Sequence, residues 1–117
     1  MTTFKRGDLI VVEVPFTDLS GSKPRPVLVV SDERFHSGVS DLLCCPVTSQ
    51  PAFFRRPGPG DVPIHGWTSV GLRYPSTVRV SKMLAVNKRV VKRALGRVAS
   101  GTLEAVEQAL RTALALS

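Results

Sequence analysis

Residues 23–31, K-P-R-P-V-L-V-V-S, carry the clearest structural signal in the chain. Five consecutive apolar residues precede Ser31, which is typical of a strand that is buried on both faces or closed into a barrel. Pro24 and Pro26 restrict the backbone on both sides of Arg25. The stretch therefore predicts a central strand over 26–31 that begins beside a rigidly held arginine.

Two further strands are predicted around this one. Residues 8–14 (DLIVVEV) are short and rich in β-branched side chains. Residues 41–49 (DLLCCPVTS) form the third strand, in which Pro46 implies an edge position or a bulge. The intervening residues 16–24 have the composition of a loop, and residues 32–40 form a polar connection.

The second half of the chain contains the only clear helix pattern. Residues 51–66, with four prolines and three glycines, predict a long loop. Residues 77–81 alternate as a strand does, whereas 83–99 fit either a strand or a helix. Residues 101–116 place apolar side chains on one face at helical spacing. Short strands followed by one helix predict a small, mainly β fold, a barrel with a C-terminal helix packed on it.

Length and composition favour a single globular domain over residues 1–117, with 43% hydrophobic residues available for a core. No stretch approaches the ~20 apolar residues of a membrane span, and the start of the chain lacks the pattern of a signal peptide. Cys44 and Cys45 are adjacent, so in a strand they point to opposite faces. We interpret them as buried apolar residues of a protein in the reducing cytoplasm.

The net charge of +7 comes entirely from one part of the chain. Residues 1–70 hold seven basic and seven acidic side chains, whereas residues 71–117 hold nine basic and two acidic ones. Such an asymmetry is explained either by a solvated basic face or by a surface that binds a polyanion. Charge alone does not choose between a nucleic acid and an acidic protein segment.

The sequence lacks the residue patterns that are typical of metal sites and of phosphate-binding loops. The two histidines, His36 and His65, are isolated, and we expect them to be loop residues of no chemical importance; the acidic residues do not cluster. The sequence therefore predicts neither a metal site nor a cofactor, and it has no glycine-rich phosphate loop before a helix. If the protein is an enzyme, we expect isolated polar groups to act without a metal.

Arg25 and Thr48 are the two candidates for such groups. A guanidinium on a stiff backbone is suited to bidentate contact with a phosphate, although an arginine in a proline-rich turn is also common at a surface. Thr48 and Ser49 stand where the third strand meets a loop, so their hydroxyls could hold a phosphate oxygen. The plain alternative for Thr48 is the ordinary preference of threonine for strands.

The order of the motifs resembles the MazF/PemK family of toxin–antitoxin ribonucleases. The resemblance lies in Gly7-Asp8 before the first strand, Arg25-Pro26 before the second, and Pro46-Val47-Thr48-Ser49 at the end of the third. Further on, residues 71–110 (GLRYPSTVRVSKMLAVNKRVVKRALGRVASGTLEAVEQAL) resemble the second half of the family pattern.

The resemblance implies an SH3-like β-barrel in which residues 92–98 form a strand. It implies a homodimer that cleaves single-stranded RNA and leaves a 2′,3′-cyclic phosphate and a 5′-hydroxyl. Arg25 and Thr48 correspond to the catalytic arginine and threonine. It also implies an acidic, MazE-like antitoxin as a partner. No membrane is expected among the partners. The alternative is a non-catalytic barrel of the same superfamily, which binds a protein target or only an antitoxin.

Other residues are candidates for RNA contacts. The loop after the first strand offers Asp18, Ser20 and Ser22, and Asp18 is its only acid where many family members have a glutamate. Phe53 lies close to Arg55 and Arg56, which combines a stacking face with phosphate contacts. The alternative for this group is a phenylalanine in the core and solvated arginines.

Overall fold

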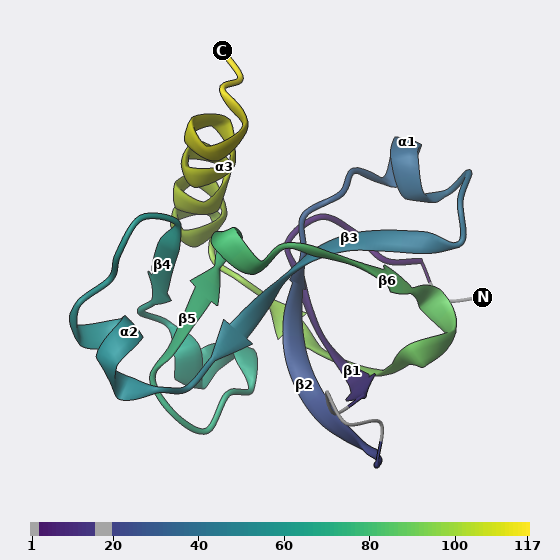
Figure 1. The fold of residues 1–117 in the computed structure, drawn as a ribbon, viewed down its shortest axis with the longest axis horizontal. Helices are drawn as coiled ribbons and strands as arrows, with labels where there is room; N and C mark the ends of the chain where they lie inside the picture. Colours follow the sequence, from purple (N-terminus) through teal and green to yellow (C-terminus); the bar gives the residue numbers. More distant parts are fainter. Residues whose placement is uncertain (1–2, 16–19) are drawn as a thin grey trace.

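The computed structural model describes residues 3–15 and 20–117 and contains one seven-stranded antiparallel sheet with a C-terminal helix (Figure 1). The strands are β1 (Asp8–Pro15), β2 (Ser22–Val29), β3 (Asp41–Thr48), β4 (Asp61–Ile64), β5 (Ser76–Arg79), β6 (Leu84–Asn87) and β7 (Val91–Arg97). The helices are α1 (Glu33–His36), α2 (Pro51–Arg55) and α3 (Ser100–Leu114), with 3₁₀ turns η1 (Trp67–Val70), η2 (Val80–Lys82) and η3 (Lys88–Val90).

The sheet order is β4-β5-β3-β2-β1-β7, and β6 also pairs with β3. The mainly β fold with a closing helix is therefore confirmed. The barrel does not close, because no ladder in the described part of the chain joins the end strands β4 and β7. The C-terminal strand that the resemblance implies over 92–98 is β7.

The apolar runs of β1, β2 and β3 are explained by two cores, one on each face of the sheet. Leu28 and Cys45 belong to one core, whereas Val27, Val29 and Cys44 belong to the other. Successive side chains of a strand point to opposite faces, so a strand covered on both sides needs an apolar residue at every position. The predicted strand over 26–31 is confirmed in part: β2 ends at Val29, Pro26 is half-buried, and residues 27–31 are buried.

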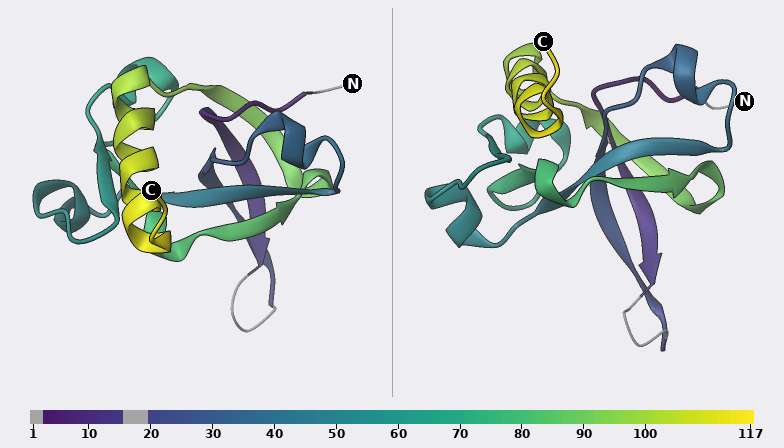
Figure 2. Two further views of the ribbon diagram at one scale, coloured as in Figure 1. Left: turned by 90° about the horizontal axis from the view of Figure 1, so that it is seen from above. Right: turned by 45° about the horizontal axis from the view of Figure 1, so that its top comes forward.

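Helix α3 completes the first core. It lies on the far side of the molecule from the paired ends of β1 and β2 at Pro15 and Ser22 (Figure 2). Val106 is fully buried, and Leu103 and Leu110 pack beside it against the first core. No helix in the described residues is long and apolar enough to cross a membrane.

Several predicted boundaries are wrong. Strand β2 begins at Ser22, so residues 22–24 belong to the hairpin and not to a loop. Residues 51–66 are not one loop, because they contain helix α2 and strand β4. A proline at the first helical position is tolerated, which explains how a proline-rich segment begins a helix at Pro51.

Pro46 lies inside the sheet and not at its edge. On one side, residues 41–44 of β3 pair with β6, and residues 47 and 48 pair with β5. Pro46 therefore occupies the gap where β3 changes partner, and it still pairs with Val27 on the other side. A residue without an N–H is tolerated in such a gap because the ladder is interrupted there.

His36 belongs to α1 and is buried and hydrogen-bonded, which corrects its prediction as a loop residue. Its Nδ1 lies 2.8 Å from Ser31 Oγ, and its Nε2 lies 2.7 Å from the backbone oxygen of Phe4. Because that carbonyl only accepts, Nε2 carries the proton and Nδ1 accepts from the Ser31 hydroxyl. The imidazole thus ties the N-terminal segment to α1.

The adjacent cysteines Cys44 and Cys45 lie on opposite faces of the sheet, as predicted, and both are free thiols and fully buried. Burial raises the pKa of the Cys44 thiol to about 12 and that of Cys45 to about 11. We expect the folded protein to react with a disulfide reagent at about pH 8 far more slowly than the unfolded chain, because the thiolate is the nucleophile. A thiol-labelling time course with and without guanidinium chloride checks this, and labelling of the folded chain at the unfolded rate would contradict it.

Candidate functional site

The β2–β3 register brings Arg25 and Thr48 to the same place in the sheet. The two strands pair antiparallel from Val29–Cys44 to Val27–Pro46. Arg25 and Thr48 each lie two residues beyond that last pair, on β2 and β3 respectively. The hydrogen-bonded ladder stops at Val27 because β3 turns away to pair with β5 through Val47 and Thr48. The two strands therefore diverge at these two residues.

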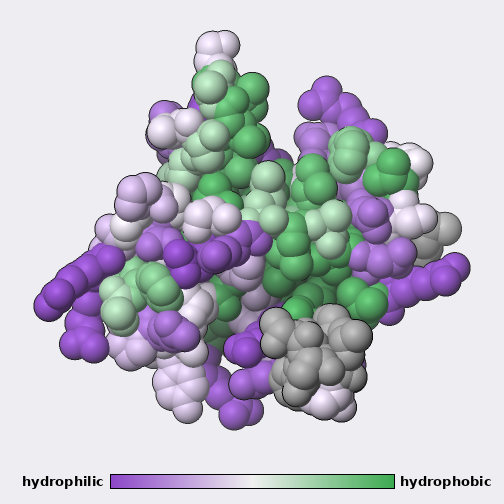
Figure 3. Space-filling view, viewed as in Figure 1, coloured by the Kyte–Doolittle hydropathy of each residue, from purple (hydrophilic) through white to green (hydrophobic). Residues whose placement is uncertain are grey.

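A groove of about 720 Å³ opens where the strands diverge. Four basic side chains line it, and the described residues of its lining include no Asp, Glu or His. The basic residues are Lys23, Arg25, Arg73 and Arg93. Hydrophilic side chains gather at the lower edge of the face in Figure 3, between the ends of β2 and β5. The groove can attract an anion, because cationic side chains in a groove with low-dielectric walls create a concentrated positive potential.

Arg25 is exposed at the mouth of the groove. No ion pair or hydrogen bond holds its guanidinium within the described ranges, so all five of its N–H donors are available to a ligand. Its backbone, in contrast, is held by pairing with Val12 of β1 and by Pro24 and Pro26 on either side. A free charged group on a fixed backbone is the arrangement that bidentate phosphate binding needs.

Thr48 presents a hydroxyl whose oxygen accepts one local hydrogen bond. The backbone N–H of Gln50 donates to Thr48 Oγ1 over 3.2 Å. Because this bond uses an acceptor position of the oxygen, the hydroxyl hydrogen is left to donate to a ligand. Thr48, Ser49 and Gln50 all line the groove beside Arg25.

Ion pairs in the fold neutralise part of the excess positive charge of residues 71–117. Basic residues of the second half pair with acids of the first half: Lys92 with Glu13, Arg97 with Asp8, and Arg79 with Asp61. In the described chain, the four basic residues of the groove make no such pair. The unneutralised charge is therefore concentrated in part at the groove.

The RNA contacts predicted at the β1–β2 hairpin, Asp18, Ser20 and Ser22, are not found in the described lining of the groove. Ser22 donates to Glu13 Oε2 over 2.7 Å and does not line the groove. The hydrogen bond from Lys92 and, to a lesser degree, the one from Ser22 hold the pKa of Glu13 below its usual value. Ser20 is also outside the lining, and Asp18 lies outside the described residues.

Phe53, Arg55 and Arg56 are on or beside α2 and are not among the groove residues. Arg79 lies over the Phe53 ring, 3.9 Å from its centroid, so one face of that ring is already covered. Arg55 and Arg56 are exposed. The fold thus brings Ser49 to Arg25 and Thr48 but leaves these three residues elsewhere.

The α2 segment is anchored by Asp61. Arg79 Nε lies 2.7 Å from Asp61 Oδ1, and the backbone N–H of Gly58 donates to Oδ2. The Asp61 side chain is only 4% exposed, so loss of its charge leaves a half-buried guanidinium unpaired. We expect Asp61→Asn to lower the free energy of unfolding by about 2 kcal/mol in urea titrations.

The matched control for this change is Asp32→Asn. Asp32 pairs with a 92% exposed Arg34 side chain, and asparagine retains its cap on α1. An exposed pair contributes at most about 1 kcal/mol. Equal effects of the two substitutions would contradict the anchoring role of Asp61.

Sequence reasoning missed six polar groove residues: Lys23, Gln50, Arg73, Tyr74, Ser76 and Arg93. Lys23 and Gln50 are close in sequence to Arg25 and Thr48, which gave a usable signal for them. The other four come from distant segments, and only strand pairing and the packing of 70–71 on Leu95 and Gly96 bring them close.

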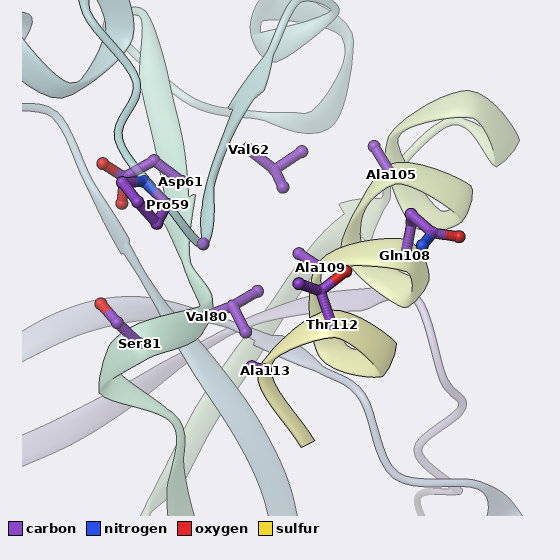
Figure 4. A pocket seen from close by; sticks show the side chains of 11 residues that line it. Pro59, Asp61, Val62, Val80, Ser81, Ala105, Gln108, Ala109, Thr112 and Ala113 are labelled. Atoms are coloured by element: carbon purple, nitrogen blue, oxygen red, sulfur yellow. The ribbon is translucent and has the colours of Figure 1, made fainter. Parts of the chain in front are cut away.

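A second groove, of about 580 Å³, lies between α3 and the segment around β4 and η2 (Figure 4). Its walls are mostly small or apolar, including Val62, Val80 and Ala109, and its one acid, Asp61, is paired with Arg79. It offers no free cation. The described residues also contain no group of three or more His, Cys, Asp or Glu placed to hold a metal.

The chain has the fold of known toxins. Its structure is similar to a mycobacterial endoribonuclease solved with its cognate antitoxin, at 22% identity, TM-score 0.76, and coverage of 100% of this chain and 98% of that one. It is similar to the MazF chain of a Deinococcus radiodurans MazE–MazF structure, at 19% identity, TM-score 0.81 and full coverage of both. It is also similar to the Mycobacterium tuberculosis toxin MazF-mt6, at 21% identity, TM-score 0.74, and coverage of 94% and 98%.

A search of curated proteins by sequence finds no match. The family of PemK-like, MazF-like toxins of type II toxin–antitoxin systems matches residues 5–114. That match spans nearly the whole chain and includes the groove. The protein therefore belongs to the PemK-like, MazF-like toxin family.

Proposed function

We propose that this protein is an endoribonuclease toxin that cleaves single-stranded RNA at specific sequences, with Arg25 and Thr48 as its catalytic residues. The observation that carries the proposal is that Arg25 and Thr48 line the same basic groove, at the point where β2 and β3 separate. Family membership and the endoribonuclease neighbours support the same activity.

The proposed step uses a nucleophile within the substrate. The ribose 2′-oxygen attacks the adjacent phosphorus and loses its proton, and the bond from phosphorus to the 5′-oxygen breaks. The 5′-oxygen takes up a proton. The products are a 2′,3′-cyclic phosphate and a 5′-hydroxyl, and no water enters this step.

Arg25 and Thr48 act on the phosphate. As the 2′-oxygen bonds to phosphorus, negative charge grows on the two non-bridging oxygens. The fork of Arg25 donates two hydrogen bonds to these oxygens and stabilises the charge more in the transition state than in the substrate. The Thr48 hydroxyl donates to the same phosphate and holds it in line for attack.

The reaction is proposed to be independent of metal. A metal in a ribonuclease commonly activates water, and here the substrate supplies its own nucleophile. An arginine side chain stays protonated throughout the ordinary pH range and is therefore a poor proton acceptor. The general base is therefore not assigned to Arg25, and Asp18 is the only acid of the loop that follows β1.

The test is incubation of the purified protein with a mixed-sequence RNA in EDTA, beside Thr48→Ala and Thr48→Ser. We expect discrete fragments with 5′-hydroxyl and cyclic phosphate ends, strongly reduced cleavage by the alanine variant, and partial activity of the serine variant. Intact RNA, or equal cleavage by all three proteins, would overturn the assignment.

The partners proposed are a second copy of this chain, in a homodimer, and an acidic cognate antitoxin in the same cytoplasm. Two of the similar structures are of toxins with their antitoxins. An acidic segment that folds on binding fits a groove with four cations and competes there with RNA. Addition of a short acidic protein from the adjacent reading frame should stop cleavage, and sedimentation should give twice the chain mass.

One observation favours a second candidate function. The described groove lining has no Asp, Glu or His that could accept the 2′-hydroxyl proton. This composition also fits a non-catalytic toxin that binds a protein target or only the antitoxin. Tight binding of the antitoxin by a protein that leaves RNA intact would select this candidate.

A further inference from the structure

The basic groove has two separate groups of cations. Lys23 and Arg25 belong to β2, beside the end of β3. Arg93 belongs to β7, and Arg73 precedes β5. β7 and β2 flank β1 on opposite sides, and across the β1 ladder Val12 pairs with Arg25 while Val11 pairs with Arg93. The strands stand about 4.8 Å apart, so the backbones of Arg25 and Arg93 are about 10 Å apart.

The second group is held together by close backbone packing. A side chain at Gly71 would meet the backbone oxygen of Leu95 at 3.5 Å, and one at Gly96 would meet the Val70 backbone at 3.6 Å. The segment that carries Arg73 therefore lies directly on β7 near Arg93. Gly71 also has a φ of +82°, which favours glycine at this turn.

The local register decides which cation of β7 enters the groove. A bulge between Val11 and Val12 leaves Lys92 without a β1 partner, and Lys92 Nζ pairs instead with Glu13 over 2.8 Å. Arg97 pairs with Asp8. Arg93 lines the groove, and in the described residues no acid neutralises it.

We propose that Arg73 and Arg93 form a second phosphate-binding subsite, which holds a phosphate of the RNA strand other than the one cleaved at Arg25 and Thr48. A chain that spans both groups must follow the groove, so the subsite fixes its direction and register. Tyr74, 63% exposed and also in the lining, stands next to Arg73 and offers a face for a base of the same strand. The inference rests on the proposed function, whose site it extends.

The experiment measures binding apart from cleavage. The probe is a fluorescein-labelled single-stranded RNA with 2′-O-methyl groups throughout, which lacks the nucleophile. Fluorescence anisotropy over a series of KCl concentrations gives the slope of log K against log salt. Each phosphate contact contributes about 0.7 to this slope on a single strand. We expect Arg93→Ala and Arg73→Ala each to reduce it by about 0.7 and to weaken binding roughly fourfold at 0.15 M salt.

Lys92→Ala is the matched control, since it removes one positive charge from the same strand at a side chain paired outside the groove. We expect its slope to equal that of the wild type, and Arg93→Lys to recover the slope lost in Arg93→Ala. Tyr74→Ala should weaken binding where Tyr74→Phe does not. Equal slopes for Arg93→Ala and Lys92→Ala would overturn the subsite.

Cleavage of unmodified RNA separates the two proposals. If the wild type binds the probe with the expected slopes but cuts no RNA, the subsite stands and the nuclease proposal fails. If the wild type cuts RNA but Arg93→Ala and Arg73→Ala show the same salt dependence of probe binding as the wild type, the nuclease proposal stands and the subsite fails. In the expected case, both variants raise KM by more than they lower kcat.

Discussion

Replacement of Arg25 by alanine should lower kcat/KM for RNA cleavage by roughly 10²–10³-fold, the range measured when one charge-stabilising donor is removed from an enzyme. In the proposed mechanism Arg25 donates to the phosphate oxygens, where charge grows during attack, so kcat should fall more than KM rises. Arg25→Lys keeps the charge but loses the planar fork, and it should recover only part of the rate.

The fold should survive this change. The Arg25 side chain is exposed and makes no hydrogen bond or ion pair in the described chain, so its removal should alter the free energy of unfolding by less than about 0.5 kcal/mol. Arg89→Ala is the matched control, because Arg89 is an exposed cation outside the groove. An active Arg25→Ala enzyme, or an equal loss in Arg89→Ala, would remove Arg25 from the mechanism.

The largest effect on stability is expected for Leu28→Ala. Leu28 is fully buried between Leu9 of β1 and Cys45 of β3, its two cross-strand partners. Truncation removes apolar burial and leaves a cavity that a sheet covered on both faces cannot close. We expect a loss of about 3 kcal/mol, within the usual span of roughly 2–5 kcal/mol.

Thermal unfolding measures this effect, and for a chain of this length the loss corresponds to a melting temperature lower by about 10–20 °C. Leu116→Ala is the control because Leu116 is 60% exposed. If Leu28→Ala melts within a degree or two of the wild type, the two-core arrangement of the sheet is wrong.

The central strands could be predicted because their pattern is local. A run such as Val27, Leu28 and Val29 needs cover on both faces whatever surrounds it, and two cores supply that cover. The helix was equally clear from its 3.6-residue period. Segments whose structure depends on distant partners were predicted less well. Asp61 belongs to a strand because Arg79 pairs opposite it and binds its carboxylate, and nothing near Asp61 in the sequence indicates that.

The candidate site divides in the same way. Arg25 and Thr48 could be singled out from the sequence because prolines bracket one and a strand ends at the other. Arg93 could not, because alternation alone does not choose among Lys92, Arg93 and Arg97. The bulge opposite Val11 and Val12 makes that choice, and it exists only in the folded sheet. His36 was missed for a related reason, since its partners Ser31 and Phe4 meet it only after folding.

The most direct test of the central claim alters one oxygen of the substrate. A cleaved RNA is first mapped to a single cut, and the nucleotide on the 5′ side of that cut is then replaced by its 2′-deoxy form. Attack by the 2′-hydroxyl predicts that cleavage at this bond disappears, while a deoxy substitution two or more nucleotides away leaves it in place. Continued cleavage at the bond that lacks its 2′-hydroxyl would contradict the account.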